Sequence, residues 1–206
     1  MRTLRQQDSQ GESAVAAFLD EYFYPKKVTN FCRKTDKKSQ LRGIDVTFDY
    51  EDKHCIVDEK AAVQYVNRDL PTFAFEINCY GRDYSLQEGW LYDKKKVTEY
   101  YLLSWIKATK VKNFESQDIT ELEILLLNRK KLRKILAEEG LNRETTREIA
   151  KKLRQNKQFG VSHKSEKPYY FYHTQHLMEQ PINVVIKKWV LRQLSEFCFI
   201  IGSEGE

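Results

Sequence analysis

The sequence lacks the features of fibrous, disordered and membrane-spanning proteins. Its 206 residues include only 8 glycines and 4 prolines, too few for a fibrous or low-complexity chain. The longest apolar runs, ILLL and FCFII, are far shorter than the roughly 20 residues that cross a bilayer as a helix. The opening segment, MRTLRQQDSQ, is polar and does not resemble a secretion signal. We therefore expect a cytoplasmic protein that does not associate with a membrane.

Cysteine is scarce as well, and no Cys-x-x-Cys pair occurs. The absence of such pairs argues against a zinc ribbon and against a dithiol redox centre. Wide spacing instead suits free thiols in a reducing compartment. The four cysteines are Cys32, Cys55, Cys79 and Cys198.

The residues that are plentiful predict a globular protein. Hydrophobic side chains make up 41% of the sequence and aromatic ones 13%, although 32% are charged. A chain of this length can bury one sizeable core, and a second independent domain is not expected.

Hydrophobic periodicity and turn residues divide the chain into helices and strands. The expected helices cover residues 10–24, 129–139, 143–156 and 187–197. The expected strands cover residues 27–33, 42–50, 54–62, 71–81, 99–106, 120–128, 168–173 and 182–186. This order predicts an α/β fold in which helices flank a central mixed sheet.

The net charge of +5 is distributed unevenly. Residues 26–42 contain seven basic side chains and one acidic side chain, and residues 128–157 contain eleven basic and four acidic ones. The remainder of the chain therefore has a net charge of −8. Two basic blocks on an acidic chain suit the binding of a polyanion such as nucleic acid, although solvated surfaces have the same composition.

Three charged residues lie within the strands of the predicted hairpin GIDVTFDYEDKHCIVDEK, outside its turn. Because side chains alternate along a strand, Asp58 and Lys60 share a face. A turn centred on Asp52-Lys53 would place Asp45 opposite Lys60, with Asp58 one step along on the same face. We therefore expect two carboxylates and one ammonium group to converge on one patch.

The chemistry of this patch is specific. Two close carboxylates repel each other unless a cation lies between them. Mg²⁺ or Mn²⁺ meets that need with oxygen ligands and keeps water molecules for chemistry. A neighbouring ammonium group orients the attacking water or stabilises negative charge in a transition state. Together these groups suit the hydrolysis of a phosphodiester.

The spacing resembles the signature of the PD-(D/E)xK nuclease superfamily, in which an Asp on one strand is followed by (Asp/Glu)-x-Lys on the next. Here Asp45 occurs in GID, and Asp58-Glu59-Lys60 occurs in VDEKA. The preceding segment QGESAVAAFL offers Glu12 as the acidic residue that members often carry on a helix before the sheet.

The resemblance implies a fold and an activity. Residues 10–110 would form a restriction-endonuclease-like core, and residues 111–206 a C-terminal α/β elaboration within a single domain over 1–206. The activity would be that of a nuclease that depends on Mg²⁺ or Mn²⁺ and acts on DNA.

The resemblance also assigns roles to individual residues. Asp45 and Asp58 would hold the metal, together with Glu12 and the backbone carbonyl of Glu59. Lys60 would position the attacking water and offset charge on the transition state. The superfamily more often has an apolar residue at the position of Glu59. This departure opens a second register, in which Glu59 is the ligand and Lys60 faces away from it.

Further residues are candidates for supporting roles. Gln64 follows the lysine by four residues and could support the site or lie on the surface. Glu76 lies on the next predicted strand and could approach the same site or pair with a nearby Lys or Arg. The basic side chains expected to contact nucleic acid are Arg33, Lys34, Lys37, Lys38, Arg42, Lys94, Lys95 and Lys96. The two predicted helices around Gly140 would suit a helix-turn-helix, although the strand before them favours ordinary α/β packing.

Two other functions stay open at the level of sequence. One is a nucleic-acid-binding protein without catalysis, and the other is a purely structural or protein-interaction domain. The sequence also leaves open whether the substrate is DNA or RNA and whether cleavage is internal or terminal. The oligomeric state is open too, with a homodimer among the alternatives.

Overall fold

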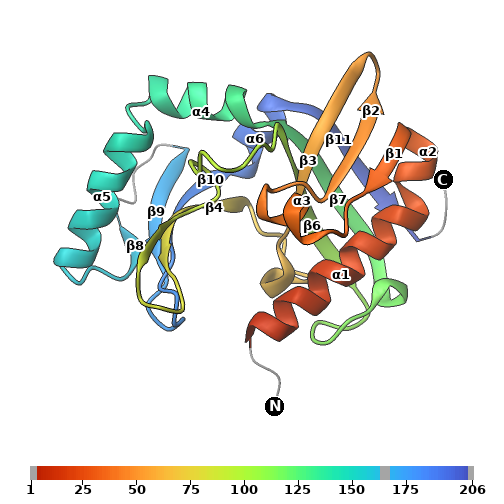
Figure 1. Cartoon of the computed structure of the whole chain (residues 1–206). Coiled ribbons are helices and arrows are strands. Elements are labelled where there is room, and N and C mark those ends of the chain that lie inside the picture. Colours follow the sequence, from red (N-terminus) through yellow and green to blue (C-terminus); the bar gives the residue numbers. More distant parts are fainter. Residues whose placement is uncertain (1–3, 163–167, 204–206) are drawn as a thin grey trace. The chain divides into compact units, whose positions relative to one another are not determined.

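The computed structural model describes residues 4–162 and 168–203 (Figure 1). The chain divides into two compact units. The first comprises Met1–Leu70, Val97–Asn128 and Ser195–Glu206, and the second comprises Pro71–Lys96 and Arg129–Leu194. The single domain expected over residues 1–206 stays a prediction. Within the described residues, no helix combines the length and the apolar content that crossing a membrane requires.

The first unit is built on a mixed six-stranded sheet. Its strands lie in the order β1-β2-β3-β6-β7-β11. Neighbouring strands are antiparallel except β3 and β6, which are parallel. The strands are β1 (Thr29–Arg33), β2 (Val46–Tyr50), β3 (Lys53–Ala61), β6 (Tyr100–Ala108), β7 (Ile119–Asn128) and β11 (Ser195–Gly202). The α/β class and the mixed sheet flanked by helices are confirmed.

Helix α1 (Leu4–Tyr22) covers one face of this sheet. Phe18 and Leu19 of the helix are fully buried against Val46, Phe48 and Val57 of the hairpin. The helix ends before the short helix α2 (Tyr24–Lys27), whose first turn contains Pro25, a residue that is tolerated at the start of a helix. Helix α3 (Lys37–Leu41) and the 3₁₀ helices η1 (Val63–Tyr65) and η2 (Ser116–Asp118) complete the unit.

The second unit contains an antiparallel five-stranded sheet in the order β5-β4-β10-β9-β8. Its strands are β4 (Thr72–Tyr80), β5 (Leu86–Glu88), β8 (Gly160–Ser162), β9 (Tyr169–His173) and β10 (Ile182–Lys187). Its helices are α4 (Arg129–Glu138), α5 (Arg143–Gln155) and α6 (Lys188–Leu194). The sequence had predicted most of these elements, but not that they form a second sheet.

One predicted helix extends too far. The helix expected over residues 187–197 ends at Leu194, and FCFII belongs to β11 at the edge of the first sheet. The segment alternates as a strand does: Phe197 and Ile201 are buried, whereas Cys198 and Ile200 are exposed. Pairing of β11 with β7, a strand far away in sequence, stabilises the extended form.

Candidate active site

The turn between β2 and β3 lies one residue earlier in the sequence than predicted. Tyr50 pairs with Lys53 across a two-residue turn, and Glu51 in that turn has a φ of 52°. The predicted register, in which Asp45 faces Lys60, is therefore wrong by two residues. Because side chains alternate with a period of two, this shift leaves each side chain on its predicted face.

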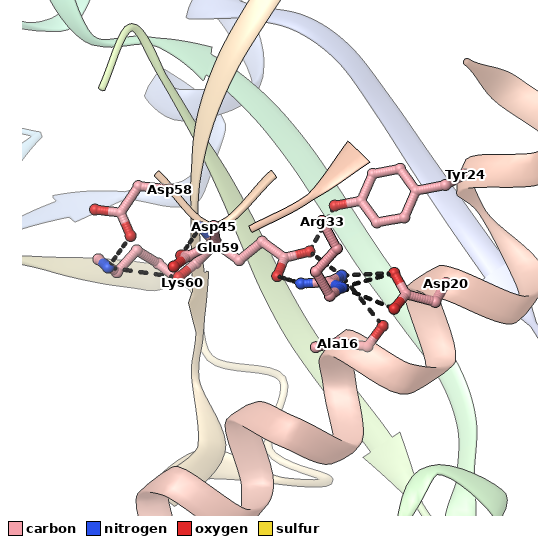
Figure 2. A network of polar contacts seen from close by, with 8 residues as sticks. All are labelled: Ala16, Asp20, Tyr24, Arg33, Asp45, Asp58, Glu59 and Lys60. Carbon is pink, nitrogen blue, oxygen red and sulfur yellow. Dashed lines mark hydrogen bonds and ion pairs between the residues drawn. The ribbon is translucent and has the colours of Figure 1, made fainter. Parts of the chain in front are cut away.

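The structure brings Asp45, Asp58 and Lys60 together (Figure 2). The ammonium group of Lys60 contacts the carboxylate of Asp58 and lies 3.4 Å from the carbonyl oxygen of Glu59. The backbone N–H of Glu59 donates to Oδ2 of Asp45 at 2.8 Å. The Asp58 side chain is 6% exposed and that of Lys60 is 26% exposed. We refer to Asp45, Asp58 and Lys60 as the acidic site.

The backbone around Asp45 is fixed by neighbouring segments. Its N–H donates to the carbonyl of Val57 at 2.9 Å, and its carbonyl accepts from the N–H of Lys34 at 2.7 Å. Just before it, Gly43 adopts a φ of 72°, which favours glycine. The hydroxyl of Thr98 donates to the Gly43 carbonyl at 2.5 Å. Three hydrogen bonds therefore fix the backbone of the segment that carries the Asp45 carboxylate.

The charges of the acidic site depend on one another. Burial raises the pKa of Asp58 to about 6, with Lys60 opposing the rise and Asp45 adding to it. Burial would lower the pKa of Lys60, but the carboxylates of Asp58, Asp45 and Glu12 outweigh it, and the pKa is raised. Lys60 is therefore an ammonium at neutral pH, and Asp58 is a buried carboxylate whose charge is only partly compensated.

Glu12 lies on α1 within electrostatic range of the acidic site. The residue is exposed, but neighbouring protein atoms shield its carboxyl group from part of the solvent, and this raises its pKa. The charge of Lys60 opposes the rise, and that of Asp45 adds to it. Its neighbour Gly11 is buried, and a Cβ there would lie 2.9 Å from the side chain of Val63. Glycine at this position therefore lets α1 approach η1 closely.

The structure gives Gln64 a partner on α1 and places Glu76 in the second unit. Gln64 is exposed on η1, and its side-chain amide donates to Asp8 of α1. Glu76 lies on β4 in the second unit, and the strand next to β3 is β6. The chain leaves the first sheet after β3 and returns to it only with β6, so the strand of Glu76 is next to the hairpin in sequence but belongs to another sheet. Supporting roles for Gln64 and Glu76 stay predictions.

Glu59, the charged residue that departs from the nuclease pattern, faces helix α1 and is fully engaged there (Figure 2). Its Oε2 accepts from Nη1 of Arg33 at 2.7 Å, and its Oε1 accepts from the hydroxyl of Tyr24 at 2.5 Å. Arg33 also donates to Asp20 at 2.6 and 2.7 Å. We call Asp20, Tyr24, Arg33 and Glu59 the helix-side network.

The helix-side network bears on two expectations. It gives Glu59 partners on the face away from Lys60, whereas Asp58 contacts Lys60, and Asp58 as the acidic ligand stays a prediction. It also occupies Arg33, whose side chain is 23% exposed and bound by two carboxylates. Arg33 therefore has a structural role in this network, and its expected contact with nucleic acid stays a prediction. Asp20 and Tyr24 were missed because they are distant in sequence from Arg33 and Glu59, the residues to which they bind.

The other expected nucleic-acid contacts are divided between the two units. Lys37 and Lys38 are exposed on α3, and Arg42 is exposed at its end. Lys34 is half-buried, with its ammonium 3.1 Å from the sulfur of Cys32. The run Lys94–Lys96 belongs to the second unit.

The donor groups of the acidic site are few. Among the residues that the structure describes, no group of three or more His, Cys, Asp or Glu side chains is placed to hold a metal ion. Two carboxylates and one backbone carbonyl remain, which is a set that Mg²⁺ accepts when water completes its coordination. The expected Mg²⁺ or Mn²⁺ stays a prediction.

Comparisons with protein-family models, with curated proteins and with solved structures gave no match. The likeness to PD-(D/E)xK nucleases therefore rests on the residues of the acidic site and on their placement in the sheet.

Proposed function

We propose that the protein is a metal-dependent nuclease that hydrolyses phosphodiester bonds in nucleic acid, with DNA as the expected substrate. The observation that carries the proposal is the convergence of Asp45, Asp58 and Lys60 on one face of the hairpin, with Asp58 almost fully buried. A buried carboxylate such as Asp58, with a second carboxylate beside it and one ammonium group, is costly for a structure to maintain unless it serves a purpose.

The residues of the acidic site fit a divalent metal. Asp45 and Asp58 would hold Mg²⁺ or Mn²⁺, with Glu12 nearby and the Glu59 carbonyl as a further donor. The raised pKa of Asp58 shows that Lys60 alone does not compensate its buried charge. A bound metal would supply Lewis-acid activation of water and of the phosphate.

The protein groups would contribute positioning and charge. Lys60 would donate hydrogen bonds to the attacking water and to phosphate oxygens, where negative charge increases in the transition state. The N–H of Glu59 would keep the Asp45 carboxylate oriented, as it does here at 2.8 Å. Lys37, Lys38 and Arg42 on and after α3 would contact the backbone of the bound strand.

A cleavage assay tests the proposal. Supercoiled, linear, single-stranded and branched DNA and an RNA of matched length are incubated with Mg²⁺ or Mn²⁺. We expect cleavage of at least one substrate, and its loss by a hundredfold or more in Lys60→Ala and Asp58→Asn. Asp49→Asn is the matched control, because Asp49 is a carboxylate of the same hairpin that pairs with His54. Folded protein that cleaves none of these substrates contradicts the proposal.

A nucleic-acid-binding protein without catalysis is the second candidate. It is favoured by the small number of metal donors among the described residues. Salt-sensitive binding of DNA without cleavage by the same preparations would support it. A structural domain predicts neither binding nor cleavage.

A further inference from the structure

The two units carry opposite net charges. The second unit contains 20 basic and 10 acidic residues, a net charge of +10. The first unit, which contains the acidic site, has 15 basic and 20 acidic residues, a net charge of −5. The net charge of +5 for the whole chain is therefore the sum of a strongly basic unit and an acidic unit.

Two arginines of α4 fix a loop of the second unit. The buried Arg129 donates from Nη1 to the carbonyl of Lys96 at 2.9 Å, and from Nη2 to the carbonyls of Asp93 at 2.7 Å and Trp90 at 3.3 Å. Nε of Arg133 donates to the carbonyl of Leu91 at 2.7 Å. Four backbone carbonyls of one loop are thus bound to the start of α4.

These hydrogen bonds join two segments that are distant in sequence and that both carry lysines. Lys94 and Lys95 of the loop are exposed, as are three lysines of α4, and the carboxylate of Asp93 is used within the loop, where it accepts from the N–H of Lys95 at 2.8 Å. Helix α4 has no acidic residue before Glu138. We call the following residues the lysine surface: Lys94, Lys95, Lys130, Lys131 and Lys134.

The lysines of this surface that lie on α4 destabilise that helix. Lys130 and Lys131 lie in the first turn of α4, where the helix dipole disfavours positive charge. Lys130 and Lys134 are four residues apart, a spacing at which like charges repel. The exposed pair of Lys134 and Glu138, at 3.9 Å, offsets little of this repulsion. A polyanion would remove both penalties.

We propose that the lysine surface binds backbone phosphates of nucleic acid, so that the second unit supplies most of the affinity for substrate. The choice of nucleic acid as the polyanion rests on the proposed function of the acidic site. Contacts of this kind carry no sequence information, and they depend steeply on salt because binding releases counterions.

The test measures binding by the full chain without divalent metal, using fluorescence anisotropy with a labelled DNA duplex over a range of salt concentrations. The variant is Lys130→Ala/Lys131→Ala/Lys134→Ala. The matched control is Arg68→Ala/Lys107→Ala/Lys112→Ala, which removes the same charge from exposed positions of the first unit that lie outside both basic blocks. We expect the slope of log K against log salt to become shallower by about 2 to 3 in the variant only, at roughly 0.9 per lost phosphate contact.

Three outcomes of this experiment either overturn the proposal or support it. An equal weakening in both variants, or in neither, overturns the proposal, provided that circular dichroism shows both to be folded. Loss of binding to vesicles of anionic phospholipid, with DNA binding unchanged, would assign the surface to a membrane and also overturn it. Selective loss of DNA binding in a protein that cleaves nothing would support the lysine surface while removing the nuclease function.

Discussion

At the scale of single residues, Asp58 determines how the acidic site responds to a cation. It is a buried carboxylate with a pKa raised to about 6. At neutral pH its negative charge is therefore only partly offset by the neighbouring Lys60. A cation that binds only the folded protein stabilises it by about 2.7 kcal/mol when the free concentration is a hundred times Kd. We therefore expect Mg²⁺ to raise the thermal unfolding midpoint of the protein, and Asp58→Asn to abolish the rise.

Asp49→Asn should keep the stabilisation by Mg²⁺, because Asp49 belongs to a separate cluster with His54 and Asn30. Differential scanning calorimetry with Mg²⁺ and with a chelator measures the effect. An equal Mg²⁺ response in Asp58→Asn and the parent protein would show that the ion binds elsewhere.

A second residue gives the protein a dependence on pH. His173 on β9 is 2% exposed, its Nδ1 lies 3.0 Å from the carbonyl of Gln158, and Arg154 approaches its other nitrogen at 3.5 Å. Burial lowers the pKa of His173, Arg154 lowers it further, and the Gln158 carbonyl opposes them. Below the ordinary value of 6.5 the unfolded chain therefore binds more protons than the folded one.

It follows that this residue destabilises the fold as pH falls below about 6.5 and has no such effect above it. We expect urea unfolding midpoints to fall between pH values of about 7.5 and 5, and to fall less in His173→Gln. The exposed His176→Gln is the control and should retain the full dependence on pH. Identical pH profiles for His173→Gln and the parent would contradict the assignment.

At the scale of elements, the helix-side network joins α1, α2, β1 and β3 through one guanidinium group. Removing Arg33 would leave Glu59 and Asp20 close together and partly buried without their cation. Because the side chains retain some exposure, we expect Arg33→Met to lower the free energy of unfolding by about 1 to 3 kcal/mol, less than for a fully buried pair.

The matched control for Arg33→Met is Lys53→Met. Lys53 pairs with Glu196 at 2.6 Å but is 50% exposed, so its loss should change stability by less than about 1 kcal/mol. Urea unfolding measures both. Adding Glu59→Gln to Arg33→Met should recover part of the loss, and strict additivity of the two substitutions would contradict a coupled network.

The elements also show how far sequence reasoning extends. The face shared by Asp45, Asp58 and Lys60 was predictable because strand alternation survives a register error of two residues. The register itself was not, since Glu51 adopts a left-handed turn without the Asn or Gly that signals one. The role of Arg33 was also hidden, because its partners Asp20 and Glu59 are 13 and 26 residues away.

At the scale of the whole molecule, the chain passes between the two units after Leu70, Lys96, Asn128 and Leu194. Each unit is therefore assembled from separated segments, and local periodicity predicts the elements but not their sheet. Strand β4 was expected and found, yet it pairs with β10 across a hundred residues. The strands of each sheet are selected by such long-range pairing, which no short window of sequence contains.

The opposite charges of the units lead to a kinetic prediction that separates their roles. Phosphate contacts on the lysine surface are the same in the ground state and in the transition state, so their loss should raise KM and leave kcat nearly unchanged. Lys60 acts on charge that develops during the reaction, so Lys60→Ala should lower kcat and leave binding nearly intact. Steady-state cleavage of one DNA substrate by the parent, by Lys60→Ala and by Lys130→Ala/Lys131→Ala/Lys134→Ala measures both effects. Added salt should reproduce the effect of the triple variant in the parent protein, because screening weakens exposed contacts most. If the triple variant lowers kcat as strongly as Lys60→Ala does, the division of binding and chemistry between the two units is wrong.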